Sequence, residues 1–494
     1  MYGEEKSDSL IVAANLANNP QGAESVERRS GAKGNAEQPH MRRTQSRESM
    51  SQRLSRVREA AKQRKKERFT ALFHLLTAEA LENAFLSLSR KAAAGVDGVR
   101  WKDYAENLKV NIADLHRRLH QGSYRAQPGR RHYIPKADGK QRPLGIASLE
   151  DKIVQYALVK ILNAVYENDF MGFSYGFRPG RSQHNALDAL ATGLVRTNVN
   201  WVLDADISQF FDKVSHEWLI RFIEHRIGDQ RVIRLIRKWL TAGTSEEGEW
   251  RASEEGTPQG AVISPLLANI YLHYVFDLWA HQWRRRHATG NVVMVRYADD
   301  IVIVFDKRID AQCFRIAMQR RLKEFGLTVH PKKTRLMEFG RFAAENRASR
   351  GKGKPETFNF LGFTHISGKD RSGRFMLIRK TRRDRMTATL KAIKDGLRKR
   401  WHYSIPEQGK WLRRVVQGYL NYHSVPGNYP MMRKFRIYVT DLWRRALRRR
   451  SQQDDTTWTK ANRLAAVWLP KVRVLHPWPV ERFTARHPRQ EPGA

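Results

Sequence analysis

The chain has 494 residues, 41% of them hydrophobic, which is enough for two to four domains with a sizeable core. Its 90 Lys and Arg outnumber its 50 Asp and Glu. The resulting net charge of +40 predicts a polyanionic partner, because each phosphate neutralised by a cation releases counterions. No apolar run is long enough for a transmembrane helix, and the N-terminus lacks a signal-peptide core. The single cysteine, Cys313, excludes an internal disulfide framework and a cysteine-rich zinc site. We therefore expect a cytoplasmic protein without a membrane partner.

The N-terminal part divides into a polar extension and a longer region with predicted helices. Residues 1–48 are polar and show no sustained period, so we expect them to be mostly disordered. A helix with a basic stretch then follows, capped by Ser49 or Ser51. Within 49–195, "RHYIPKADGKQRPLGIA" predicts a hairpin around Asp138 and Gly139.

Strong strand patterns appear in residues 196–368. "NWVLDADISQFF", "VVMVRYADDIVIVF" and "FNFLGFTHI" are strand-like, and helical segments lie between them. This mixed order predicts an α+β domain with an antiparallel sheet.

The C-terminal quarter differs in charge. Residues 371–494 hold 30 Lys and Arg against 8 Asp and Glu, a net charge of +22. Residues 369–450 predict basic amphipathic helices with interleaved Trp and Tyr, and residues 451–494 predict a basic tail. The aromatic residues can simply be the core of a helical domain. The alternative is that this domain grips nucleic acid.

Two adjacent acids interrupt the strand pattern at "YADD". Asp299 and Asp300 lie between two apolar strands, where they could form an ordinary solvated turn. A second strand also contains acids, Asp204 and Asp206, and an acid on a buried strand needs a partner or a metal ion. If the two strands are neighbours, carboxylates converge, and such hard oxygen ligands suit Mg²⁺. Two ions of this kind stabilise both the attacking and the leaving oxygen in phosphoryl transfer.

Six sequence blocks in order resemble the motifs of reverse transcriptases, and more narrowly those of group II intron-encoded reverse transcriptase/maturases. The blocks are "IPKADGKQRPLGI", "SYGFRPGRSQHNAL", "LDADISQFFDKV", "EGTPQGAVISPLLANIYLH", "YADD", and "LTVHPKKTRLMEF" with "FNFLGF". The resemblance runs from about residue 70 to 450. It implies a right-hand polymerase with fingers (49–195), a palm (196–368) and a helical thumb or maturase domain (369–450).

The resemblance implies a catalytic set. The family's strand aspartate is followed by Ile and, five positions on, by an aromatic residue, which selects Asp206. Periodicity alone leaves Asp204 equally eligible, because it lies on the same strand face. The implied metal ligands for two Mg²⁺ ions, with Mn²⁺ as a substitute, are Asp206, Asp299, Asp300 and the carbonyl of Ile207.

The resemblance also implies residues that contact the substrates. Those for the dNTP are Lys136, Arg142, Phe211 and Gln259, and Phe211 would exclude a 2′-hydroxyl. The two cations could instead belong to an exposed basic hairpin, and Phe211 could be an ordinary core residue. Leu361, Gly362 and Phe363 resemble the primer grip. The arginines expected to bind RNA and template–primer are Arg178, Arg181, Arg413, Arg414, Arg444 and Arg445.

The implied function is an RNA-directed DNA polymerase, encoded by a group II intron, that supports retrohoming and splicing. Its partners would be intron RNA, template RNA, primer or target DNA and dNTPs, in a nucleoid-associated bacterial ribonucleoprotein. No cysteine follows Cys313, so we expect no paired-cysteine endonuclease, as in short class C relatives. The alternatives are a retron-like, diversity-generating or defence-associated enzyme and a splicing factor with an inactive polymerase site. A nucleotide-driven motor lacks support, because the phosphate-binding GxxxxGK[ST] motif is missing. The sequence does not indicate the oligomeric state.

Overall fold

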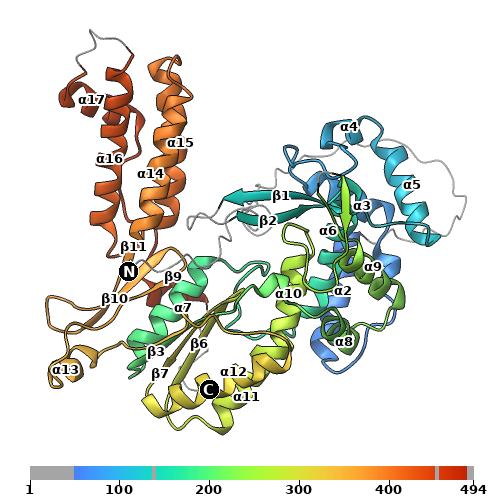
Figure 1. Cartoon of the computed structure of the whole chain (residues 1–494), viewed down its shortest axis with the longest axis horizontal. Helices are drawn as coiled ribbons and strands as arrows, with labels where there is room; N and C mark the ends of the chain where they lie inside the picture. Colours follow the sequence, from blue (N-terminus) through green and yellow to red (C-terminus); the bar gives the residue numbers. More distant parts are fainter. Residues whose placement is uncertain (1–48, 136–140, 247, 451–455, 487–494) are drawn as a thin grey trace, which may run out of the picture. The chain divides into compact units, whose positions relative to one another are not determined.

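The computed structural model describes residues 49–135, 141–246, 248–450 and 456–486 (Figure 1). The predicted disorder of residues 1–48 and the predicted contact at Lys136 lie outside this range. The chain forms two compact units, which alternate along the sequence. The first contains the described residues up to Ser182 with 207–281 and 318–329, and the second contains 183–206, 282–317 and the described residues from His330 onward. No helix in the described residues is long and apolar enough to cross a membrane.

The first unit is mainly helical and includes a small sheet. Its sheet has the strand order β2-β1-β4-β5, in which β1 and β2 form the predicted antiparallel hairpin. Ser49 caps the first helix, α2, and completes a capping box with Gln52. The elements are α2 (Met50–Gln63), η1 (Phe73–Leu75), α3 (Ala78–Ser87), α4 (Trp101–Glu106), α5 (Leu108–His120), β1 (Gly129–Pro135), β2 (Gln141–Ile146), α6 (Leu149–Tyr166), η2 (Phe210–Asp212), α8 (His216–Arg226), α9 (Gln230–Thr241), β4 (Thr244–Glu246), β5 (Glu249–Arg251), α10 (Ser264–Leu272) and η3 (His273–Asp277).

The second unit contains two sheets and most of the C-terminal helices. An antiparallel sheet has the strand order β6-β7-β3-β8, and a smaller one has the order β11-β10-β9. Two helices, α11 (Leu278–Arg286) and α12 (Arg308–Glu324), contribute residues to both units. The other elements are α7 (Gln183–Arg196), β3 (Trp201–Asp206), β6 (Val292–Tyr297), β7 (Asp300–Phe305), β8 (Arg335–Glu338), α13 (Ala343–Ala348), β9 (Phe358–Phe360), β10 (Phe363–Lys369), β11 (Phe375–Thr381), α14 (Arg383–Arg398), α15 (Ile405–His423), α16 (Tyr429–Arg448), α17 (Trp458–Trp468) and α18 (Pro479–Arg486).

Burial explains the order of strands in the four-stranded sheet. Every residue of β7 is buried, and β3 is buried except for its first residue. Such burial is typical of central strands, whose two faces are both covered, and the apolar, β-branched run "IVIV" of β7 suits this position. The fold is therefore α+β with an antiparallel sheet, as the sequence predicts.

The helices α14 to α17 pack around a shared apolar core, and Figure 1 shows α14, α15 and α16 side by side. The aromatic residues of the C-terminal quarter split between core and surface. Trp443 and Tyr419 are buried in this core and Trp411 packs against it, whereas Trp401 and Tyr422 are half-buried and lie outside it. The core interpretation therefore holds for part of the aromatic set. The division into fingers, palm and thumb, with boundaries at 195, 368 and 450, stays a prediction.

Candidate active site

The "YADD" acids lie at the turn between β6 and β7. Strand β6 ends at Tyr297 and β7 begins at Asp300. Between them, Ala298 has a φ of +56°, a left-handed conformation that costs free energy for a residue with a side chain. Arg296, which is fully buried, donates a hydrogen bond from Nη1 to the Ala298 carbonyl at 3.0 Å. This bond helps to hold the turn that presents Asp299.

Strand β3 brings a third carboxylate to the same edge of the sheet. Asp206 is the last residue of β3 and pairs in register with Asp300 of the antiparallel strand β7. The exposed fractions of Asp206, Asp299 and Asp300 are 5%, 7% and 6%. Three nearly buried acids therefore gather at one end of a sheet, in a chain of strongly positive net charge. Burying like charges together is unfavourable unless cations compensate them.

The structure also distinguishes Asp206 from Asp204. Asp204 is equally buried, but it pairs with Val302 in the interior of the sheet and with Arg335 of β8. Asp206 instead lies at the strand end, in register with the first residue after the turn. Only Asp206 is thus placed at the turn that carries the "YADD" acids.

A lysine near the carboxylates was not predicted. Nζ of Lys333 lies 3.5 Å from Oδ2 of Asp206, and the backbone N–H of His330 donates to the Asp206 carbonyl at 2.7 Å. Lys333 belongs to "HPKKTRL", but its position beside another lysine gave no reason to choose between the two. Its ammonium supplies one compensating positive charge at the site.

The donor set suits a hard divalent cation. In the described part of the chain, no group of three or more His, Cys, Asp and Glu side chains forms a ready-made metal site. Mg²⁺ commonly binds through one or two carboxylates and takes its remaining ligands from water and substrate phosphates. The register pair Asp206 and Asp300, with Asp299 next to it in sequence, offers such carboxylates. The predicted Ile207 ligand belongs to the first unit, where its backbone forms a bridge with Val329.

In the first unit, two predicted dNTP-binding residues lie together. Nε of Arg142 donates to Oε1 of Gln259 at 2.8 Å, and Nε2 of Gln259 donates to Oδ1 of Asp212 at 2.8 Å. The backbone supports this contact, since the Gly145 N–H donates to the Gln259 carbonyl at 2.7 Å. Gly260, at a φ of +110°, would bring a Cβ within 3.1 Å of the Gly145 carbonyl oxygen. Glycine is therefore needed for the close approach of these two segments.

The two adjacent phenylalanines of the first unit point to different environments. Phe210 is 2% exposed, and its ring lies 6.4 Å from that of Tyr271. Phe211 is only partly buried, and its carbonyl accepts a hydrogen bond from the Thr257 N–H at 2.7 Å. Gly256 approaches the same carbonyl so closely that a Cβ there would lie 2.9 Å from it. Phe210 is thus the core residue of the pair, and Phe211 is the more accessible.

The predicted primer grip forms a tight turn in the second unit. Leu361 and Gly362 connect β9 to β10 and have φ values of +45° and +78°. The hydroxyl of Tyr422 donates to the Leu361 carbonyl at 2.8 Å, and the Arg382 N–H donates to the Gly362 carbonyl at 3.1 Å. The contact between Tyr422 and this turn was not predicted, because Tyr422 lies about 60 residues further along the chain, in helix α15. We call residues 361–363 the LGF turn.

The arginines predicted to bind RNA differ in exposure. Arg178 is 2% exposed and donates to Glu167 and to the carbonyls of Met171 and Ser174. Its role in this structure is to fasten the segment after α6, and contact with RNA there stays a prediction. Arg181 donates to the Gly172 carbonyl at 2.6 Å. The other four lie on α15 and α16, where the exposed residues are Arg413, Arg414 and Arg445 and the half-buried one is Arg444.

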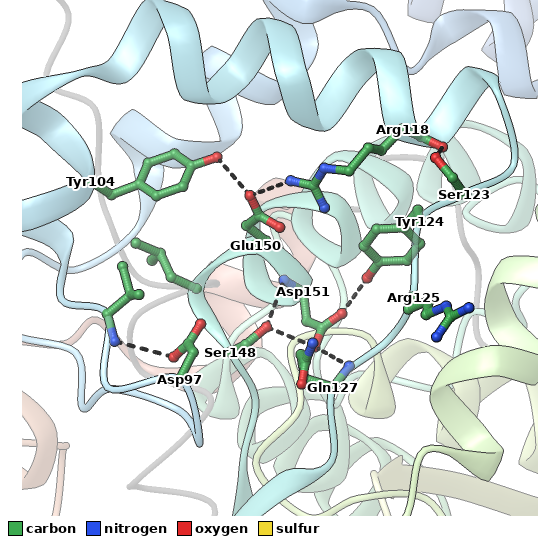
Figure 2. Close-up of a pocket in the computed structure, with 12 residues that line it drawn as sticks. Asp97, Tyr104, Arg118, Ser123, Tyr124, Arg125, Gln127, Ser148, Glu150 and Asp151 are labelled. Carbon is green, nitrogen blue, oxygen red and sulfur yellow. Dashed lines mark hydrogen bonds and ion pairs between the residues drawn. The ribbon is translucent and has the colours of Figure 1, made fainter.

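A separate hollow of the first unit also contains acids (Figure 2). It has a volume of about 420 Å³ and lies at the N-terminus of α6. Its deepest acid, Asp151, accepts hydrogen bonds from Ser148 Oγ at 2.8 Å, from the Gln127 N–H at 3.0 Å and from the Tyr124 hydroxyl. Glu150 is paired with Arg118 at 2.7 Å. These acids are committed to internal contacts that fasten α6 to the segment after α5.

Comparison with known proteins shows what the region that contains the acids is similar to. Residues 134–365 match the family model described as reverse transcriptase (RNA-dependent DNA polymerase). The chain is 39% identical over 254 residues to protein YkfC of Escherichia coli K12 and 37% identical over 223 residues to the group II intron-encoded protein LtrA of Lactococcus lactis. It is 42% identical over 172 residues to an uncharacterized 91 kDa protein in the cob intron of Schizosaccharomyces pombe.

These alignments cover 45%, 44% and 35% of the chain in the same order. The chain spans 66%, 37% and 21% of the lengths of these relatives. The carboxylates, the LGF turn and the predicted dNTP-binding residues all lie within residues 134–365, the part of the chain that matches the family model.

Proposed function

We propose, from the match of residues 134–365 to the reverse transcriptase model and the similarity to a group II intron-encoded protein, that the chain is an RNA-directed DNA polymerase with maturase activity. It would copy intron RNA into DNA for retrohoming and would promote splicing of the same RNA. The observation that carries the proposal is the register pair Asp206 and Asp300 beside Asp299, three nearly buried acids at one sheet edge within the matched region. Grouped acids would hold the metal ions that phosphoryl transfer needs. They do not stabilise the sheet, because buried like charges repel one another.

The reaction joins a primer to a nucleotide. The primer 3′-oxygen attacks the α-phosphorus of a dNTP, a new phosphodiester bond forms, and the bond to pyrophosphate breaks. Asp206 and Asp299 would hold Mg²⁺, with Asp300 in support. When bound, such ions lower the cost of charge on the attacking and leaving oxygens. In the second unit, positive charge would therefore come from the ions held by the carboxylates and from the ammonium of Lys333.

The nucleotide would be bound by residues of the first unit. Arg142 presents a guanidinium already oriented by Gln259, and Gln259 is itself oriented by Asp212. A preoriented cation stabilises the charge that develops on the triphosphate without further reorganisation. The partly buried ring of Phe211 would lie under the sugar, where it would disfavour a 2′-hydroxyl.

Nucleic acid would be bound by the LGF turn and the basic helices. The turn is a primer-grip candidate, because its backbone is fixed by hydrogen bonds from Tyr422 and Arg382. The exposed arginines of α15 and α16 would neutralise backbone phosphates of template–primer and intron RNA. In these terms, the proposed fingers (49–195) lie largely in the first unit, the four-stranded sheet of the second unit belongs to the proposed palm (196–368), and α14 to α16 form most of the proposed thumb (369–450). Action in the cytoplasm as a ribonucleoprotein is part of the same proposal.

The test is extension of a DNA primer on an RNA template with Mg²⁺ and dNTPs, paired with a splicing assay on the intron RNA that surrounds the coding region. We expect RNA-templated extension and faster splicing in the presence of the protein. Extension without any effect on splicing would favour a retron-like or defence-associated enzyme. Splicing without extension would favour an RNA-binding factor with an inactive polymerase site.

A further inference from the structure

The C-terminal segment 469–486 folds back within the second unit. We call these residues the C-terminal strap. It begins at Leu469, which is buried in the core of α14 to α17, and it ends with α18, which packs against α7. The strap therefore touches the helical cluster at one end and a helix next to the carboxylate-bearing sheet at the other.

The strap is fastened to α7 by a buried ion pair. Asp188 of α7 is 2% exposed, and both of its oxygens accept hydrogen bonds from the guanidinium of Arg482, one of them at 2.9 Å. Arg379 of β11 lies 3.8 Å from the same carboxylate. A bidentate pair fixes the geometry of both side chains, and removal of one partner would leave the other charge buried and uncompensated. A second contact, from Arg196 to the hydroxyl of Thr484 at 2.9 Å, fixes the far end of α18.

The strap is also fastened to the end of α15. The Leu475 N–H donates to the Ser424 carbonyl at 2.9 Å, and Nε2 of His476 lies 2.7 Å from the Asn421 carbonyl. Nη1 of Arg482 lies 2.8 Å from Nδ1 of His476. A neutral imidazole with its proton on Nε2 satisfies both contacts, because it donates to the carbonyl and accepts from the guanidinium.

A short path of contacts leads from the strap to the LGF turn. The ring of His476 stacks on His184 of α7 with centroids 4.0 Å apart, and His184 in turn lies 5.0 Å from the ring of Tyr422. The Tyr422 hydroxyl donates to the Leu361 carbonyl. Because Leu361 has a positive φ, its conformation persists only if the surroundings hold it. The strap thus contacts Tyr422, which holds the LGF turn, through the ring of His184.

We propose that the C-terminal strap positions the LGF turn, with Arg482 as its positioning residue, and that it thereby fixes the primer 3′ end for extension. The inference rests on the proposed polymerase function for its catalytic readout, but not for its structural one. Arg482 touches neither the carboxylates nor the turn and acts through His476, His184 and Tyr422.

The first test compares Arg482→Gln with Arg473→Gln. Arg473 is an exposed arginine of the same strap, so the control removes the same charge. Asp188 keeps Arg379 nearby in the Arg482 variant. Arg482→Lys keeps the charge and preserves the test if the Gln variant fails to fold. We expect the Arg482 variants to raise the KM for primer about two- to thirtyfold, the range of coupling through packed side chains. The KM for dNTP should stay near wild type.

Hydrogen exchange provides the readout that does not depend on activity. The Arg382 N–H donates to the Gly362 carbonyl, so its exchange reports on the LGF turn. We expect faster exchange at Arg382 in Arg482→Gln than in Arg473→Gln. Equal exchange and equal primer KM in the two variants would overturn the role of the strap. A wild-type protein that shows no extension, with the exchange difference present, would instead overturn the polymerase function alone.

A double-mutant cycle tests the path itself. Tyr422→Phe removes only the hydroxyl that reaches Leu361. If Arg482 acts through Tyr422, the double variant Arg482→Gln/Tyr422→Phe should raise the primer KM no more than the stronger single variant does. Multiplicative effects of the two changes would contradict the path.

Discussion

The two units differ in how they arrange charged side chains: the first joins opposite charges by hydrogen bonds, and the second groups like charges. In the first unit, Arg142, Gln259 and Asp212 are joined by two successive hydrogen bonds, so a cation and an anion lie at the two ends of one chain of contacts. In the second unit, Asp206, Asp299 and Asp300 place like charges together at a buried strand end, with Lys333 as a nearby cation. The hydrogen bonds of the first unit orient the Arg142 guanidinium before a substrate binds. The acids of the second unit need added cations to compensate their charge. Changes in the two units should therefore fail in different ways.

The largest effect is expected for Asp299→Asn in the second unit. Loss of a metal ligand should lower RNA-templated extension by more than about 100-fold, since loss of a residue that only orients a metal ligand can already cost up to about 100-fold. The same change removes a buried like charge, so the melting temperature should not fall. Extension rate and melting temperature, measured on one preparation, check both expectations.

Asp306→Asn is the matched control for Asp299→Asn. Asp306 directly follows the last residue of the same strand, β7, at its opposite end. Near-wild-type extension is expected. If Asp299→Asn extends a primer as well as this control does, the carboxylates do not hold the catalytic ions.

A smaller and different effect is expected for Arg142→Ala in the first unit. Loss of a charge-assisted contact worth about 1.5–3 kcal/mol should raise the KM for dNTP about 10- to 100-fold. Arg131→Ala is the control, because Arg131 lies on the partner strand and donates to Thr244 instead. Steady-state kinetics with varied dNTP distinguish the two. An unchanged KM in Arg142→Ala would place the triphosphate elsewhere.

Phe211 and Phe210 offer a comparison within the first unit. Phe211→Ala should allow ribonucleotide incorporation to rise about 10- to 100-fold relative to deoxynucleotides, the scale of steric selection by one side chain. Phe210→Ala should instead lower the free energy of unfolding by about 3–5 kcal/mol, because it leaves a cavity in the core. Competition between the two nucleotide types, with denaturant unfolding, measures both. Equal selection of deoxynucleotides over ribonucleotides by wild type and Phe211→Ala would show that Phe211 is an ordinary packing residue.

The smallest predicted effect concerns acid stability of the second unit. Burial, with Arg379 in support, lowers the pKa of His365 from 6.5 to about 3. The folded state then keeps this histidine neutral while the unfolded chain binds a proton below pH 6.5. The stability contributed by neutral His365 is therefore lost as the pH falls from 6.5 toward 3, by up to about 1.4 kcal/mol per pH unit.

His365→Phe should remove that dependence, since the ring stacks on Phe358 with centroids 4.7 Å apart and Phe can replace it. Urea unfolding of both proteins between pH 7 and pH 5 gives the slope. Parallel slopes for the two proteins would show that His365 does not titrate with this pKa.

Much of the carboxylate-bearing sheet could be predicted from the sequence because its signal is local. Apolar runs interrupted by acids predict strands that end in carboxylates, and the structure pairs Asp206 with Asp300 accordingly. The choice of Asp206 over Asp204 came from the family pattern. In the structure, Asp206 lies at the end of its strand and Asp204 lies in the strand interior. The alternation of strand faces is the same for both residues, so it could not distinguish them.

Other features depend on contacts between distant segments. The bond between Arg142 and Gln259 joins residues 117 positions apart, and that between Arg482 and Asp188 joins residues 294 positions apart. Residues 451–494 were predicted to be a basic tail, yet helices form at 458–468 and 479–486. Arg178 shows a further limit: its predicted contact with RNA stays a prediction, and the sequence did not reveal that its guanidinium is buried against Glu167. A charged residue in the sequence does not reveal its partner.

The most direct test of the central claim compares Asp206→Asn with Asp204→Asn in primer extension on an RNA template with Mg²⁺. Both changes remove a buried acid from β3, two residues apart on one strand face. Wild type and Asp204→Asn are predicted to extend the primer, and Asp206→Asn is predicted to lose extension while it still folds. Extension by Asp206→Asn, or an equal loss in both folded variants, would contradict the assignment of the catalytic site.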